Sequence, residues 1–139
     1  MDKVSALRKY FGLDGFRPGQ ERLIDDILCG RDCLGIMPTG GGKSLCYQLP
    51  ALLLPGLTLV VSPLISLMKD QVEALREDGI PAAYLNSSLD TQERREVLAG
   101  LGRGEFRLLY IAPERLDSRA FASLAQELEI SLVAVDEAH

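Results

Sequence analysis

Residues 37–48 read Met-Pro-Thr-Gly-Gly-Gly-Lys-Ser-Leu-Cys-Tyr-Gln and directly follow the short apolar run 33–37. A strand, a glycine-rich turn, a Lys-Ser pair and an apolar helix over 45–54 are the parts of a phosphate-binding loop. Glycines let backbone N–H groups approach phosphate oxygens closely, and the helix start adds the positive end of its dipole. The stretch therefore predicts a nucleotide-binding α/β domain.

The side chains of this loop have different predicted roles in binding a nucleotide. Lys43 is expected to reach the β- and γ-phosphates, and the Ser44 hydroxyl is expected to ligate Mg²⁺. Met37 stands where the loop pattern has its first glycine, so the alternative is an ordinary glycine-rich turn before a helix. The preceding strand and the Lys-Ser pair favour nucleotide binding. The predicted nucleotide contacts in the loop are Thr39, Gly40, Gly41, Gly42, Lys43 and Ser44.

Outward from the loop, apolar runs alternate with amphipathic stretches. Such alternation is typical of a mostly parallel sheet with helices on both faces. Uncharged or nearly uncharged runs predict strands at 33–37, 58–62, 82–85, 107–112 and 131–135, each buried on both faces. Helical spacing predicts helices over 23–28, 64–75 and 121–128, and a further one opened by the capping-box pair Asp90 and Glu93. We expect residues 1–30 to form a helical lead-in and residues 31–139 to form the nucleotide-binding domain.

The last predicted strand runs into two carboxylates, Asp136 and Glu137. Ligands of parallel α/β sheets bind at the carboxyl ends of strands. Asp136 is therefore expected to hold Mg²⁺, and Glu137 to polarise the attacking water. An acidic pair after a strand is more often a solvated turn or a helix cap, but its occurrence together with the phosphate loop favours a catalytic site with Lys43, Asp136 and Glu137.

Composition excludes several other classes of protein. The 139 residues carry 15 Lys and Arg against 20 Asp and Glu, a net charge of −5, which argues against a general polyanion binder. The only histidine is His139 and the three cysteines form no Cys-x-x-Cys pair, so no zinc site is expected. We interpret the cysteines as packed, reduced thiols and the compartment as cytoplasmic. Residues 45–68 are uncharged, but their prolines predict helix, turn and strand instead of a membrane span.

Five ordered motifs carry a resemblance to a known family. The motifs are FRPGQ at 16–20, MPTGGGKSLCYQ at 37–48, VVSPLISLMKDQV at 60–72, LYIAPERL at 109–116 and DEAH at 136–139. Together they resemble the first RecA-like motor domain of RecQ-type DNA helicases, in helicase superfamily 2, where methionine at the first loop position is usual. The resemblance implies a P-loop domain that binds single-stranded or partly duplex DNA and uses ATP and Mg²⁺ to drive 3′-to-5′ DNA unwinding in repair and recombination.

The resemblance also implies residue roles. Gln20 would read the adenine edge and Arg17 would help to hold the nucleotide, while Leu13 occupies a position that is commonly a stacking aromatic residue. DNA contact, or coupling of that contact to ATP, is implied for Ser62, Lys69, Asn86, Glu114, Arg115 and His139. The alternatives without DNA contact are a solvated helix face for Lys69 and Arg115 and a strand-end turn for Asn86.

The resemblance further implies parts beyond these residues. The family continues after the DEAH motif with the rest of the first domain and a second motor domain, which supplies an arginine finger worth about 10³ to 10⁵ in rate. We therefore expect a domain truncated after the Walker B strand, with slow ATP hydrolysis and no unwinding on its own. The alternatives are an inactive nucleotide-binding fragment and a P-loop ATPase that does not act on nucleic acid.

Overall fold

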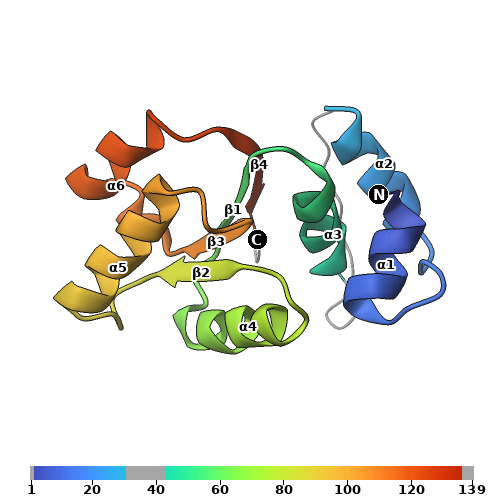
Figure 1. Cartoon of the computed structure of the whole chain (residues 1–139), viewed down its shortest axis with the longest axis horizontal. Helices are drawn as coiled ribbons and strands as arrows, with labels where there is room; N and C mark the ends of the chain where they lie inside the picture. Colours follow the sequence, from blue (N-terminus) through green and yellow to red (C-terminus); the bar gives the residue numbers. More distant parts are fainter. Residues whose placement is uncertain (1, 31–42, 136–139) are drawn as a thin grey trace. The chain divides into compact units, whose positions relative to one another are not determined.

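The computed structural model describes residues 2–30 and 43–135, which form two compact units, 1–55 and 56–139. The first unit contains the helices α1 (Lys3–Phe11), α2 (Gln20–Leu28) and α3 (Leu45–Leu53). The second contains β1 (Leu57–Val61), α4 (Ile65–Glu77), β2 (Ala82–Leu85), α5 (Thr91–Gly102), β3 (Leu108–Ile111), the 3₁₀ turn η1 (Pro113–Arg115), α6 (Arg119–Ala125) and β4 (Ile130–Val135) (Figure 1). The predicted strand 33–37 lies outside the described residues.

The first unit is a small helical core. Leu7 of α1, Ile24 of α2 and Leu45 and Leu49 of α3 are buried against one another. Lys3 fastens α1 to α2, because its ammonium nitrogen lies 2.6 Å from an Asp25 oxygen and 2.8 Å from a Glu21 oxygen. These two carboxylates, Asp25 first, raise the pKa of Lys3.

The helix ends in this unit follow from local sequence. The Asp2 carboxylate caps α1 by accepting from the Ser5 N–H at 2.7 Å, and Gly12 ends that helix at φ 65°, a left-handed conformation that favours glycine. α3 carries Pro50 in its interior and ends at Leu53. The uncharged stretch 45–68 thus folds as α3, a turn, β1 and the start of α4. Within the described residues, no helix has both the length and the apolar character needed to cross a membrane.

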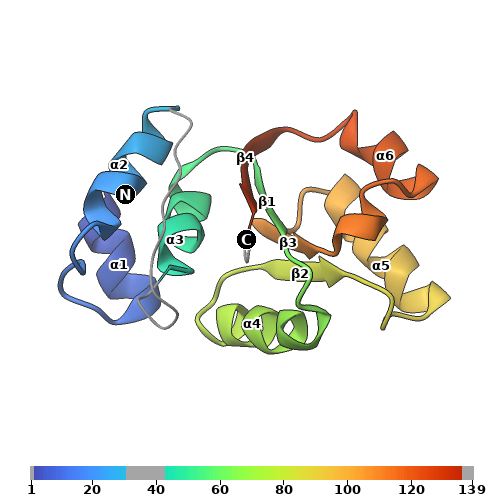
Figure 2. The ribbon, with the colours of Figure 1, turned by 180° about the vertical axis from the view of Figure 1, so that it is seen from behind.

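The second unit is a parallel four-stranded sheet in the order β2-β3-β1-β4. α5 and α6 cover one face, where Leu101 and Phe121 pack on Leu59, Leu85 and Leu109. α4 lies on the opposite face, as both views of the ribbon show (Figures 1 and 2). It buries Met68, Val72 and Leu75. The sheet and its helices confirm the predicted α/β class.

The strand register brings the carboxyl ends of all four strands into one row. Val61 pairs with Ile111 and with Val135, and Ile111 pairs with Leu85. Residues that follow these four therefore leave the sheet at a common edge, where a ligand of a parallel sheet binds.

Three expectations need correction. β4 is not buried on both faces: Val133 and Val135 are 55% and 63% exposed, because β4 ends the order of described strands and has β1 as its paired neighbour. The helix predicted over 121–128 ends at Ala125, and Leu128 packs on the same core from a turn. Cys29 is exposed rather than packed, since it follows the last residue of α2, whereas Cys46 is buried.

Candidate nucleotide site and strand-end residues

Lys43 and Ser44 stand directly before α3, as the sequence predicts. The Ser44 carbonyl accepts from the Tyr47 and Gln48 N–H groups at 3.3 and 2.9 Å, so the hydrogen bonding of the helix begins at Ser44. The Ser44 hydroxyl makes no capping hydrogen bond with the first turn. Helix starts present backbone N–H groups and a positive dipole end. This is the part of the predicted phosphate loop that the structure describes; Thr39, Gly40, Gly41 and Gly42 lie outside it.

Gln20 is the first residue of α2 and is only 2% exposed. The Gln20 side-chain oxygen accepts from the backbone N–H of Arg17 at 2.7 Å, and the backbone N–H of Gln20 donates to the Arg17 carbonyl at 3.0 Å. Gly19, at φ 84°, supplies the left-handed residue that this tight turn requires. The Gln20 amide is therefore held in a fixed orientation.

The residues predicted to recognise adenine and phosphate belong to helices with a shared core. Ile24, one turn after Gln20, packs on Leu45 and Leu49, which follow Ser44. Leu13 lies after the end of α1 and is 46% exposed, so its apolar side chain is accessible. RecQ-type DNA helicases, which the motifs resemble, commonly have an aromatic residue at this position. The unit thus holds both predicted recognition elements on one small scaffold.

In the second unit, Ser62 and Asn86 follow β1 and β2 at the common edge and are both buried, at 5% and 1% exposure. The Asn86 side-chain oxygen accepts from the Ser88 N–H at 2.8 Å, and its amide nitrogen donates to the Met68 sulfur at 3.4 Å. The Ser62 hydroxyl accepts from the Leu64 N–H at 3.2 Å. These hydrogen bonds shape the strand-end turns.

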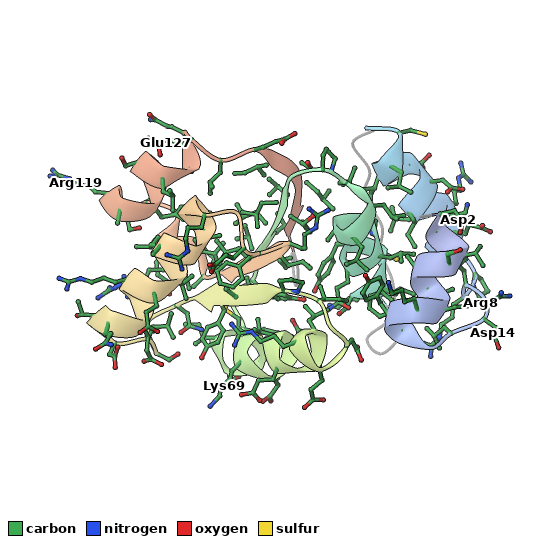
Figure 3. All side chains as sticks on the ribbon, in the orientation of Figure 1. Asp2, Arg8, Asp14, Lys69, Arg119 and Glu127 are labelled. Carbon is green, nitrogen blue, oxygen red and sulfur yellow. The ribbon has the colours of Figure 1, made fainter. Side chains whose placement is uncertain are left out.

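The other predicted DNA contacts are more accessible. Lys69 points away from the sheet on the outer side of α4 (Figure 3), with its side chain 67% exposed and 4.0 Å from a Glu73 oxygen. Glu114 is exposed in η1, and Arg115 is half-buried. Asp136, Glu137 and His139 lie outside the described residues.

The structure brings Asn86 and Arg115 together in the lining of one pocket of about 270 Å³. Arg94 and Arg95 of α5, for which the sequence motifs predict no role, also line this pocket. Their signal in the sequence is modest: two adjacent arginines one turn after the Asp90 cap, on a helix that starts beside a strand end.

Comparisons with known proteins agree with the motif pattern. Residues 17–139 match the model of the DEAD/DEAH box helicase family. The chain is 54% identical over 138 residues to the ATP-dependent DNA helicase RecQ of Bacillus subtilis, and 52% identical over 136 residues to that of Pasteurella multocida. It is 48% identical over 137 residues to the ATP-dependent DNA helicase Q-like 5 of Arabidopsis thaliana. These alignments cover 97%, 98% and 98% of this chain but 23%, 22% and 15% of the relatives, so the chain spans a quarter of their length or less.

Proposed function

The chain belongs to the DEAD/DEAH box helicase family, and from that premise we propose that it is the ATP-binding part of a RecQ-type DNA helicase motor. The observation that carries the proposal is the placement of Lys43 and Ser44 immediately before α3. α3 shares a hydrophobic core with α2, the helix that begins at Gln20. Residues 1–30 would serve as the lead-in with the adenine motif, and residues 31–139 as the partial RecA-like domain.

The proposed roles follow from the chemistry of each side chain. The backbone of Thr39, Gly40, Gly41 and Gly42 would cradle the phosphates, and Lys43 would neutralise charge at the β- and γ-phosphates. Ser44 and Asp136 would hold Mg²⁺, which offsets the phosphate charge when it is bound. Glu137 would orient and polarise the attacking water.

Adenine recognition would come from the first unit. The fixed Gln20 amide has both a donor and an acceptor, which is what the edge of adenine requires. Arg17, in the same turn, would help to hold the nucleotide, and the exposed Leu13 would cover the base by apolar contact.

The proposed DNA contacts lie at the common edge of the sheet. Ser62 and Asn86 would shape the turns at this edge. Arg115 would approach the phosphates of the DNA strand, and Lys69 and Glu114 would contact DNA, or couple that contact to ATP, from exposed positions. His139 would link the γ-phosphate to DNA. In the longer protein, we propose that these contacts serve 3′-to-5′ unwinding in repair and recombination, at a cytoplasmic location.

For the 139 residues alone, we propose ATP binding with slow hydrolysis. In related phosphoryl-transfer sites an arginine finger contributes about 10³ to 10⁵ in rate, and in the proposed motor that group belongs to a second domain. Unwinding also requires two domains that close and open with nucleotide. The alternative of an ATPase unrelated to nucleic acid is disfavoured by the family match over residues 17–139.

The test is steady-state ATP hydrolysis by the 139-residue chain with and without single-stranded DNA, with Glu137→Gln as the matched variant. We expect Mg²⁺-dependent, very slow turnover that is insensitive to DNA, and no turnover in Glu137→Gln although that variant still binds ATP. Turnover that survives Glu137→Gln would refute the assigned site. Strong stimulation by DNA would refute the proposal that a second domain is required.

A further inference from the structure

The outer edge of β2 is not paired with another described strand. β2 stands first in the order β2-β3-β1-β4 and pairs with β3 alone among the strands that the structure describes. The Leu85 carbonyl accepts from the Ala112 N–H, directly after β3, at 3.1 Å. Alternate residues of a strand turn their backbone groups to opposite sides, so Ala82 and Tyr84 direct theirs away from β3. A chain that pairs with β2 from outside therefore meets the backbone groups of these two residues.

This edge is covered only in part. The Arg76 side chain of α4 donates from its Nε to the Ala82 carbonyl at 2.9 Å. Within the described residues, no backbone group is bonded to the outward N–H and C=O of Tyr84. An unpaired strand edge is a template for another strand. Arg76 thus occupies one carbonyl of the edge and leaves the groups of Tyr84 available.

A pocket of about 260 Å³ lies beside the same edge. β2 packs against both α4 and α5, and Figure 1 shows it running between them. Arg76 and Tyr84 line the pocket from α4 and β2, and Leu89, Val97 and Phe106 line it from α5 and the segments at its two ends. These three apolar side chains are only partly buried where they pack on the core of the sheet. The pocket therefore offers apolar surface next to an open strand edge.

The α5 side of the pocket also carries negative charge. Glu93 and Glu96 are exposed and line it. Neither carboxylate forms an ion pair with a residue that the structure describes. Glu93 accepts from the Asp90 N–H at 3.0 Å and Glu96 from the Gln92 amide at 3.3 Å, and both of those donors are uncharged. Two carboxylates thus lie beside the edge without a cationic partner.

We propose that this edge binds an extended segment of a partner protein, which adds a strand beside β2 and carries a lysine or arginine two positions from an apolar residue. Backbone hydrogen bonds to Tyr84 supply affinity, as in other cases of strand addition. Residues two positions apart in a strand share a face, so the cation and the apolar side chain both face α5. The inference goes beyond the proposed function, because this surface takes a protein and not a nucleotide or DNA.

Charge favours a basic partner over a second copy of this chain. Two copies joined through the same edge by a two-fold axis bring Glu93 and Glu96 of one chain toward the same residues of the other. Like charges that face each other across paired strands are unfavourable. The same carboxylates repel the phosphates of a nucleic acid. Arg76 lies on the α4 side, so the residue between the cation and the apolar side chain is uncharged.

The test uses a fluorescent peptide, Thr-Lys-Thr-Val-Thr-Lys-Thr, whose lysines and valine share one face. Its binding to the 139-residue chain is followed by anisotropy. Two matched peptides change one property each: glutamate replaces both lysines, or every backbone nitrogen is methylated and cannot donate. Glu93→Gln with Glu96→Gln alters the pocket, and glutamine at the Glu93 position still completes the capping box. The control, Glu73→Gln with Glu127→Gln, removes the same charge outside the pocket.

We expect the peptide to bind the parent chain, and to bind the pocket variant about fivefold more weakly, the effect of two exposed ion pairs. The control variant should bind like the parent, and the glutamate and methylated peptides should lose binding. Equal binding by the two double variants would overturn the inference. Failure of the parent to bind the lysine peptide, or equal binding of the methylated peptide, would overturn it as well.

Hydrogen exchange at Tyr84 tests the edge without any substitution. In the free chain the Tyr84 N–H should exchange faster than the N–H groups of Ala83 and Leu85, which face β3. Bound peptide should slow exchange at Tyr84 about tenfold. An unchanged rate with peptide bound would refute strand addition. Protection of Tyr84 that rises with the concentration of the chain alone would refute the choice of a different protein as partner.

Discussion

At the residue scale, Gln20 combines two tasks in one buried side chain. Its oxygen closes the 17–20 turn, and its amide is proposed to read adenine. Gln20→Glu keeps an oxygen for the Arg17 N–H but replaces the NH₂ donor, so the turn can persist while the adenine contact is lost. We expect ATP to bind about tenfold more weakly, the cost of one unpaired polar contact. Calorimetric titration with ATP and GTP checks this, and an unchanged preference for ATP would contradict the adenine role.

Asn86 is the clearest structural residue among the predicted DNA contacts. It is 1% exposed; its side-chain nitrogen donates to the Met68 sulfur and its side-chain oxygen accepts from the Ser88 N–H. Asn86→Ala would remove the acceptor of the Ser88 N–H and leave a cavity at a fully buried position, so we expect the free energy of unfolding to fall by about 1–3 kcal/mol. Urea unfolding should show this loss, and Ser87→Ala, at an exposed neighbour, should show little change. Equal stability of the two variants would contradict the structural role.

Residue types and spacing correctly placed Lys43 and Ser44 before α3 and Ser62 and Asn86 after strands, because each of these motifs keeps its residues close together in sequence. The arginine pocket could not be found that way. Arg94 and Arg115 are far apart in sequence, and they meet only because β2 and β3 are parallel neighbours whose carboxyl ends coincide. Whether a side chain is committed to a turn, as Asn86 is, also depends on contacts that spacing does not reveal.

At the element scale, α1 depends on a titratable cap. The Ser5 backbone N–H and then its hydroxyl, which both donate to the Asp2 carboxylate, lower the pKa of Asp2 below its usual 3.8. A lowered carboxyl pKa stabilises the folded state above pH 3.8, and this contribution is lost as the pH falls through the lowered pKa. We expect the Ser5 amide resonance to shift with that transition in an NMR titration. Asp2→Asn caps without titrating, so a shift that persists in this variant would contradict the assignment.

Most elements were predictable because their signals are local. The capping box of Asp90 and Glu93 opens α5 as expected, and the strands predicted at 58–62, 82–85 and 107–112 agree within a residue or so with β1, β2 and β3. The misjudged features depend on tertiary surroundings. The apolar run 131–135 predicted a strand correctly, but its position at the end of the described sheet, and hence the exposure of Val133, follows from strand order.

At the scale of the whole molecule, the sheet register depends on a close approach at Gly56. Its N–H donates to the Ser131 hydroxyl at 2.8 Å, and a Cβ there would lie 2.4 Å from the Glu129 carbonyl oxygen. Gly56→Ala must therefore displace the start of β4 from β1, and we expect it to lower the free energy of unfolding by about 1–3 kcal/mol.

The matched control is Gly102→Ala, where a Cβ would meet only the Leu124 side chain at 3.8 Å, an ordinary contact. Thermal and urea unfolding of both variants provide the comparison. A Gly56→Ala chain as stable as Gly102→Ala would show that the backbone approach between β1 and β4 is not as tight as described.

We propose that residues 37–48 form an ATP site, and calorimetric titration of the chain with ATP in the presence and absence of Mg²⁺ is the first measurement to make. We expect Mg²⁺-dependent binding that Lys43→Ala abolishes by removing the phosphate-facing charge. Lys9→Ala, at an exposed lysine of α1, should leave binding unchanged. Binding that is the same in Lys43→Ala as in the parent chain, or absent from the folded parent, would contradict the claim.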